Sequence, residues 1–258
     1  PLARGSPSYW LGWDVDTHDR HARLIREAER NGQPLTVDTR VDSYRGVTEI
    51  TVYTADHPGL FSRISGALAV AGASIAGARI FTMKNGMALD TFWVRDAAGG
   101  RFDRADKLAR VSSVIERTLA GRLRPMQELA RQRTNLPTRY DSFQVPPRVL
   151  IDNHISARHT VIEVNGRDRP GLLYEVTQVL TKANVMIHAA KISTFGERVV
   201  DVFYVQTALG GKIDSHQKLR HLRQKLTEVL NDPNGKPAKP GSKGTGRDKA
   251  PAETKARG

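Results

Sequence analysis

The sequence contains two copies of one unit, and this duplication most constrains how the chain can fold. Residues 51–82 align with residues 163–194 at a constant offset of 112, and both segments contain the phrase Asp-x-Pro-Gly-Leu. After a gap of one residue the match resumes, with Asp90, Phe92 and Val94 over Asp201, Phe203 and Val205. Agreement at so many positions is not accidental, so we expect two units of the same fold.

Both copies predict the same order of elements. A β-branched run leads into Asp-x-Pro-Gly-Leu, and apolar residues then recur with helical spacing. Asp56 and Asp168 are expected to cap these helices, and Pro58 and Pro170 suit a first helical turn. The helices are expected to end at Ala71-Gly72 and Ala183-Asn184. A hairpin and a second amphipathic helix follow in each copy.

This order is an α+β, ferredoxin-like plan, in which two helices cover one face of an antiparallel four-stranded sheet. Nothing after residue 230 can supply a fourth strand, but short β-type runs precede each copy at 35–41 and 149–155. We therefore expect permuted units, strand–strand–helix–strand–strand–helix, at 34–122 and 147–231. The edge strand then comes before the first strand of the common plan.

The remaining segments lie outside the repeat. Residues 1–33 contain a charged helix, preceded by Tyr9, Trp10 and Trp13, which look like the edge of a larger core. Residues 123–146 are predicted to be a linker helix beginning at Pro125, followed by a proline-containing connector. Residues 232–258 hold seven Lys or Arg, four Pro and five Gly, with no aromatic residue, which predicts a basic disordered tail.

Composition narrows the function classes. The formal net charge of +13 could indicate nucleic-acid binding, but the basic residues are not interleaved with base-stacking aromatic residues, so we consider nucleic acid an unlikely partner. No window has the roughly 18 apolar residues of a membrane span. The absence of cysteine excludes disulfides, thiol nucleophiles and Cys-ligated metals, and we expect a cytoplasmic protein. Because the first residue is Pro1, we expect a fragment or a processed chain.

The two Asp-x-Pro-Gly-Leu phrases are the strongest candidate sites. A helix N-terminus offers free N–H groups and a positive dipole end to a carboxylate. Gly59 and Gly171 allow a close approach, and the carboxylates of Asp56 and Asp168 could accept hydrogen bonds from an ammonium group. A free amino acid presents both groups. The alternative is that the phrase only makes a tight turn between strand and helix.

Other chemistry finds little support. His18 and His21 lie three residues apart beside Asp16 and Asp19 and could ligate a metal, but an exposed helix of mixed charge has the same pattern, and we predict no metal site. No nucleophile elbow and no phosphate-binding loop is present. We therefore predict no catalytic centre in this sequence.

The two repeats resemble ACT domains, small modules that often bind amino acids. Longer phrases resemble the C-terminal part of the family of bifunctional PII uridylyltransferase/uridylyl-removing enzymes. They are YWLGWD (9–14), HARLIREAE (21–29), TVYTADHPGLFSRI (51–64), VLIDNHIS (149–156), TVIEVNGRDRPGLLYEVT (160–177) and GERVVDVFYV (196–205).

This resemblance implies a parent enzyme with a nucleotidyltransferase domain, which uridylylates the PII signal protein, and an HD-type phosphohydrolase domain, which removes the UMP. Two ACT domains would sense glutamine and switch between the two activities. Residues 1–33 would be a helical remnant of the HD-type domain and a linker. Magnesium would be expected in the parent enzyme, and no cofactor in this segment.

The resemblance also assigns residues. The ligand loops of the ACT domains would comprise Asp56, His57, Gly59, Leu60, Asp168, Arg169, Gly171 and Leu172. The edges along which ACT domains pair, within or between chains, would comprise Ile75, Ala76, Ala78, Ile187, His188 and Ala190. Since the copies differ at His57 and Arg169, we expect the two sites to bind unequally.

Three alternatives stay open. A stand-alone regulator with ACT repeats would bind an amino acid without catalytic domains. An alarmone synthetase/hydrolase would usually carry one ACT unit. A nucleic-acid binder would depend on charge alone.

Overall fold

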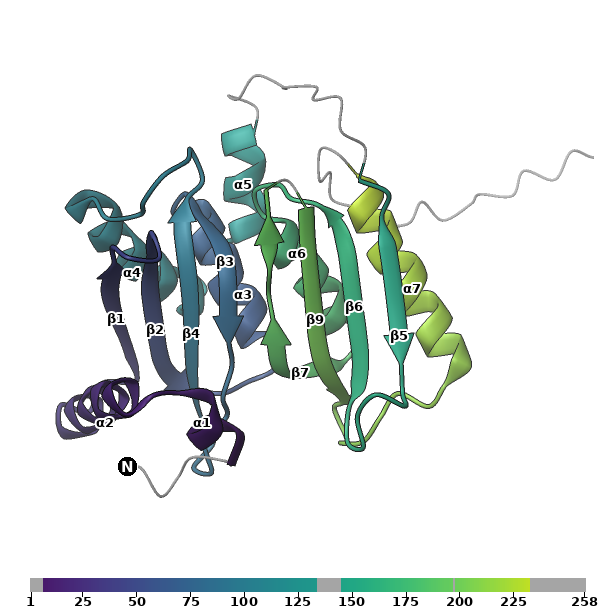
Figure 1. The fold of residues 1–258 in the computed structure, drawn as a ribbon, viewed down its shortest axis with the longest axis horizontal. Helices are drawn as coiled ribbons and strands as arrows, with labels where there is room; N and C mark the ends of the chain where they lie inside the picture. Colours follow the sequence, from purple (N-terminus) through teal and green to yellow (C-terminus); the bar gives the residue numbers. More distant parts are fainter. Residues whose placement is uncertain (1–6, 134–144, 197, 233–258) are drawn as a thin grey trace, which may run out of the picture.

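The computed structural model describes residues 7–133, 145–196 and 198–232, which fold into two similar units lying side by side (Figure 1). The first unit consists of β1 (Leu35–Asp42), β2 (Val47–Ala55), α3 (Leu60–Val70), β3 (Ala73–Arg79), β4 (Met87–Asp96) and α4 (Ala105–Leu119). The second consists of β5 (Arg148–Asp152), β6 (Thr160–Arg167), α6 (Leu172–Lys182), β7 (Val185–Lys191), β8 (Thr194–Phe195), β9 (Arg198–Thr207) and α7 (His216–Asn231). Outside them lie α1 (Pro7–Gly12), α2 (Val15–Arg30) and α5 (Pro125–Arg133).

Each unit contains one antiparallel sheet with the same strand order. The order is β1-β2-β4-β3 in the first unit and β5-β6-β9-β7 in the second, where the short β8 also pairs with β9. The preceding strand of each unit occupies an edge, as the repeat predicts. This confirms the α+β, ferredoxin-like ACT fold in its permuted form.

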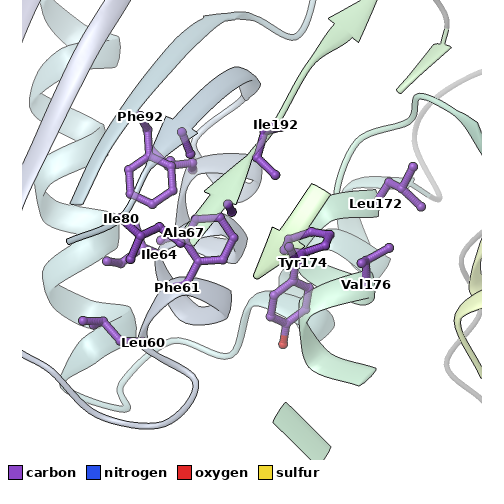
Figure 2. Close-up of a cluster of buried hydrophobic side chains, with 14 of the residues drawn as sticks. Leu60, Phe61, Ile64, Ala67, Ile80, Phe92, Leu172, Tyr174, Val176 and Ile192 are labelled. Atoms are coloured by element: carbon purple, nitrogen blue, oxygen red, sulfur yellow. The ribbon is translucent and has the colours of Figure 1, made fainter. Parts of the chain in front are cut away.

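A single hydrophobic core runs through both units. Alternate residues of β2, β4, β6 and β9 point to the face that the helices cover, and they are almost fully buried there. Figure 2 shows the part of this core around Phe61, whose ring stacks on Phe92 at a centroid distance of 5.4 Å. The ring of Tyr174 from the second unit belongs to the same cluster. The two units therefore share buried apolar surface.

The units meet along α3 and α6 and along the edge strands β3 and β7 (Figure 1). The side-chain amide of Gln178 donates a hydrogen bond to Oγ of Ser62 at 2.9 Å between the two helices. Both edge strands carry a register shift at equivalent positions, between Ile75 and Gly77 and between Ile187 and Ala189. Among the described strands, β3 and β7 form no ladder with each other.

Helices α1 and α2 pack on the face of the first sheet opposite α3 and α4. Tyr9 is 1% exposed and joins Ile25 of α2, Tyr53 of β2 and Leu89 of β4 in a second, smaller core. Tyr9 thus packs within this chain, against α2 and the first sheet. The outward positions of β2 and β4 are apolar at this end of the sheet, so the helices have a surface to cover.

The structure confirms the predicted ends of the first helix of each unit and the predicted linker helix. Helix α3 ends before Gly72, at φ 83°, and α6 before Asn184, at φ 53°, as predicted. The linker helix beginning at Pro125 is present as α5. Most of the predicted proline-containing connector and almost all of the predicted tail lie outside the described residues. No helix in the described part of the chain is long and apolar enough to cross a membrane.

Candidate functional site

Each Asp-x-Pro-Gly-Leu phrase forms a tight turn between a strand and a helix. The N–H of Leu60 donates to the carbonyl of His57 at 3.0 Å, and Gly59 has φ 84° and ψ 4°. The second turn repeats this geometry, with Gly171 at φ 82° and ψ 2°. These angles define a type II turn, which requires a positive φ at its third residue and favours proline at its second.

This turn corrects the predicted helix caps. The residue preceding α3 is Gly59 and the residue preceding α6 is Gly171, and neither helix has a side-chain cap. Asp56 and Asp168 stand three residues further back, and both prolines precede the helix. The glycine turn separates the carboxylates from the first N–H groups, which leaves the carboxylates free for other contacts.

The two turn carboxylates make different contacts. Asp56 accepts a hydrogen bond from Oγ1 of Thr82 at 2.7 Å. The equivalent residue of the second unit is Thr194, whose hydroxyl instead donates across the junction to the carbonyl of Ile75 at 3.4 Å. Burial raises the pKa of Asp168, which a backbone hydrogen bond and the charge of Arg169 partly offset. The Asp168 carboxyl therefore lacks the threonine partner that engages Asp56.

His57 and Arg169, which differ between the copies, also differ in role. Nδ1 of His57 lies 3.1 Å from the carbonyl oxygen of its neighbour Pro58. The guanidinium of Arg169 donates to Glu175 of α6 at 2.5 Å and to the carbonyl of Val229 of α7 at 3.1 Å. Its Nη1 is buried without a hydrogen-bond partner among the described residues. Arg169 thus holds its turn against two helices and keeps one donor nitrogen unused.

Each turn borders a cavity that both units build. The second cavity, of about 150 Å³, lies between the turn of residues 168–172 and the first unit, which contributes Ser65, Ala69, Ser74 and Ile75. The first cavity, of about 40 Å³, lies between the turn of residues 56–60 and the second unit. A Cβ on Gly59 would lie 3.0 Å from Cγ2 of Thr181 on α6. The first cavity holds little more than one water molecule, so only the second has room for a small organic ligand.

A buried aspartate lines each cavity, and the sequence motifs point to neither of them as a site residue. Asp90 on β4 is 1% exposed and Asp201 on β9 is 2% exposed. Oδ1 of Asp90 has no hydrogen-bond partner among the described residues, whereas Oδ1 of Asp201 accepts from the N–H of Ser193 at 3.3 Å. The signal that could have found them is an acidic residue at equivalent positions of both copies, among residues that alternate into the core.

The surroundings of both buried carboxyls favour the neutral form. Burial raises the pKa of Asp201 to about 7, and the nearby charge of Asp168 acts in the same direction. Burial also raises the pKa of Asp90 well above its usual value, with a further contribution from Asp56. Two carboxyls in one cavity compete to ionise, and a cation placed between them would relieve that competition.

The predicted pairing edges lie at the junction of the units. Ile75 borders the second cavity, and Ile187 and His188 border the first. Ala78 and Ala190 are buried, and Ala76 is half-buried on β3. Since the two units of one chain face each other here, the predicted edges contribute walls to both cavities.

His21 of α2 is packed in the smaller core and contacts Tyr9. His21 is 1% exposed, and its Nδ1 lies 3.1 Å from the hydroxyl of Tyr9. The helix is therefore not an exposed one of mixed charge, because one face of it is buried on the first sheet. No group of three or more His, Cys, Asp or Glu residues that could hold a metal was found in the part of the chain that the structure describes.

The second cavity brings together groups that suit a zwitterion. At the start of α6 the N–H of Leu172 closes the turn on the carbonyl of Arg169, and the N–H groups that follow it have no acceptor within the helix. Arg169 contributes a positive charge, and Asp168 and Asp201 contribute acceptors for an ammonium group. This arrangement presents groups of opposite charge to a small zwitterion.

The chain is similar to an ACT-domain family and to curated enzymes. Residues 155–231 match the model of the ACR family N-terminal ACT domain. The chain is 54% identical over 90% of its length to the bifunctional uridylyltransferase/uridylyl-removing enzyme of Azospirillum brasilense, and 52% identical over 89% to that of Gluconobacter oxydans. It spans 25% and 24% of these two relatives. Among solved structures, aspartate kinase from Synechocystis matches 72% of this chain with 27% of its own, at 15% identity and a TM-score of 0.41.

Proposed function

We propose that this chain, a homologue of bifunctional uridylyltransferase/uridylyl-removing enzymes that contains an ACT domain, is the glutamine-sensing C-terminal regulatory segment of such an enzyme. The parent enzyme would transfer UMP to the PII signal protein and remove it again, with magnesium serving its catalytic domains. The observation that carries the proposal is the second cavity, which has room for a ligand and is walled by both ACT-type units.

Glutamine would fit the chemistry of this cavity. Its carboxylate would face the N–H groups at the start of α6, and its ammonium group would face the carboxyl of Asp168. Its side-chain amide would find hydroxyl partners in Ser65 and Ser74, which line the opposite wall. The hydroxyl of Ser65 is buried without a hydrogen-bond partner among the described residues, which supports a polar group of the ligand at this wall.

Regulation would follow from the position of the cavity between the units. A ligand that contacts both walls binds better to one relative orientation of the units than to another, and only this difference in affinity can shift an equilibrium. We propose that the orientation favoured by glutamine supports UMP removal over UMP transfer in the parent enzyme.

Isothermal titration calorimetry on this chain tests the proposal. Glutamine is expected to bind at millimolar or lower concentration, and glutamate and asparagine more weakly. Loss of a charge-assisted hydrogen bond in the variant Asp168→Asn is expected to weaken binding about ten- to a hundredfold.

The repeat supplies the matched control for this measurement. Asp56→Asn makes the same change beside the first cavity, which is too small for the ligand, and is expected to leave the affinity unchanged. No binding heat with millimolar glutamine would contradict the sensing role. Equal losses in both variants would contradict the assignment to the second cavity.

A further inference from the structure

We infer that Asp201 is a second carboxyl that, together with Asp168, receives the ammonium group of an amino acid in the second cavity, and that Asp201 releases a proton on doing so. The inference deepens the proposed function and depends on the ligand being an amino acid. On binding, the neutral carboxyl of Asp201 loses its proton to solvent and the resulting carboxylate pairs with the ammonium group. No covalent bond of the ligand changes.

The geometry places the Asp201 carboxyl at the cavity and leaves half of it unused. Asp201 lies opposite Val164 in the centre of the sheet, on the same face as the core residues Phe203 and Val205. It borders the second cavity, and its Oδ1 accepts from the N–H of Ser193. No donor in the described part of the chain reaches its Oδ2, so a ligand can use that oxygen.

A purely structural role for Asp201 explains its hydrogen bond with Ser193 but does not explain why this residue is an acid. An asparagine could accept the same bond from Ser193 without the cost of burying an ionisable group. The first unit has the same design, since the backbone N–H of Phe81, which corresponds to Ser193, faces Asp90. Of the two copies of this costly group, Asp201 is the one beside the cavity with room for a ligand, which favours a binding role for Asp201.

The charged neighbours of Asp201 determine how binding depends on pH. The titratable groups that line the second cavity with it are Asp168 and Arg169 of the turn and Tyr174 of α6. The elements of the first unit contribute serine, alanine and isoleucine side chains to the wall. Burial and the charge of Asp168 raise the pKa of Asp201 to about 7. Asp201 is therefore mostly protonated at pH 6 and mostly ionised at pH 8.5.

The sign of the effect follows from linkage. Below pH 7 the ammonium group must displace a proton, so the affinity is expected to rise about tenfold per pH unit between pH 5 and pH 7 and to level off above pH 8. About one proton is expected to be released per ligand at pH 6, and almost none at pH 8.5.

The experiment is calorimetry of the chain at pH 6 and pH 8.5, each in two buffers of different ionisation enthalpy. The probes are L-glutamine, L-glutamate, L-asparagine and N-acetyl-L-glutamine, which has no ammonium group. We expect proton release with glutamine at pH 6 only, and no binding of the N-acetyl compound. Asp201→Asn is expected to abolish the proton release and to weaken binding at least tenfold. The matched variant Asp90→Asn is expected to change neither.

The outcomes separate this inference from the proposed function. If glutamine binds and Asp201→Asn releases the same proton, or if Asp90→Asn alone loses it, the role of Asp201 is overturned while glutamine sensing stands. If another amino acid, but not glutamine, binds with proton release through Asp201, the inference holds and glutamine sensing fails. If none of the amino acids binds, both are overturned.

A second measurement decides the case if Asp201→Asn does not fold. The side-chain carboxyl carbon of Asp201 can be followed by NMR in the unmodified chain during a pH titration, with and without the ligand. A titration near pH 7 that moves at least two units lower with the bound amino acid supports the inference. A titration that the ligand does not move overturns it.

Discussion

His21 is buried on α2 in its neutral form. Burial lowers its pKa to about 4, and the positive charge of Arg20 acts in the same direction. Its Nδ1 lies within hydrogen-bond distance of the hydroxyl of Tyr9, which fixes the ring between α1 and α2. In the unfolded chain the same imidazole titrates near its ordinary value of about 6.5.

The first prediction concerns acid stability. Between pH 6.5 and pH 4 the unfolded state binds a proton that the folded state does not, so the folded state loses stability as the pH falls through this window. The expected contribution of His21 to this loss is about 2 kcal/mol between pH 7 and pH 5. In His21→Gln, which cannot titrate, urea unfolding followed by tryptophan fluorescence should show a correspondingly smaller difference between the two pH values.

The control for this prediction is His221→Gln, which changes an exposed histidine on α7. It should retain the pH dependence of the unmodified chain. An unchanged pH dependence in His21→Gln would show that His21 is not the group responsible.

At the residue scale, the sequence indicates the turns but not the full set of acids. Asp-x-Pro-Gly-Leu is recognisable because proline and glycine at these places predict a turn. Asp90 and Asp201 occupy core positions of their strands, and a single acid in an apolar alternation does not reveal whether it faces a cavity. Only the packing of two units against each other forms that cavity, and such packing cannot be derived from either repeat alone.

At the scale of elements, the turn before α3 is pressed against α6. Gly59 has a positive φ, and Thr181 of α6 leaves no room for a side chain there. Gly46, in the turn between β1 and β2, also has a positive φ, at 64°, but a Cβ on it would meet no atom within 4 Å. Substituting Gly46 therefore introduces backbone strain alone, whereas substituting Gly59 introduces backbone strain and a contact with Thr181.

The second prediction is that Gly59→Ala destabilises the chain more than Gly46→Ala. Both variants pay about 1–2 kcal/mol for the left-handed backbone, and only the first also pushes on Thr181. Adding Thr181→Ser to Gly59→Ala removes the methyl group in contact and should recover the additional part. The free energies of unfolding of the single and double variants measure this coupling. Equal costs for both glycines, with no recovery, would contradict the contact.

The order of the elements was predictable because equivalent segments stand at equivalent positions of the two repeats. The runs at 35–41 and 149–155 precede both copies, so they had to serve the same edge in both sheets, and β1 and β5 do so. The packing of α1 and α2 was not predictable in the same way, because the described part of the second unit contains no counterpart. A signal for it is that Tyr53 and Leu89 are apolar residues at outward positions of β2 and β4.

At the scale of the whole molecule, the contact between α3 and α6 depends on Gly66. A Cβ at this position would lie 2.7 Å from Cδ2 of Tyr174 and 2.7 Å from Cβ of Pro125. Helix α6 and the linker helix α5 therefore both approach α3 at Gly66, where α3 has no side chain.

The third prediction is that Gly66→Ala loosens the two units. Alanine gains about 1 kcal/mol in helix propensity, but overpacking at a rigid contact costs about 1–3 kcal/mol and the helices must move apart. Calorimetric unfolding should show a lower midpoint and a broader transition than in the unmodified chain.

Ser65→Ala serves as the control on the same helix. It removes a buried hydroxyl that has no hydrogen-bond partner among the described residues and adds no atom, so the midpoint should stay equal or rise. A Gly66→Ala variant as stable as Ser65→Ala would mean that the contact between the helices adapts without cost.

The register shifts in β3 and β7 bear on how the two sheets are joined. Each shift interrupts the regular spacing of backbone groups on the edge that faces the other unit, which discourages the two edges from joining into one continuous sheet. The backbone hydrogen bonds of each ladder consequently stay within one unit, and in the described strands no ladder joins the two sheets. What holds the sheets side by side is therefore side-chain packing across the seam, chiefly between α3 and α6.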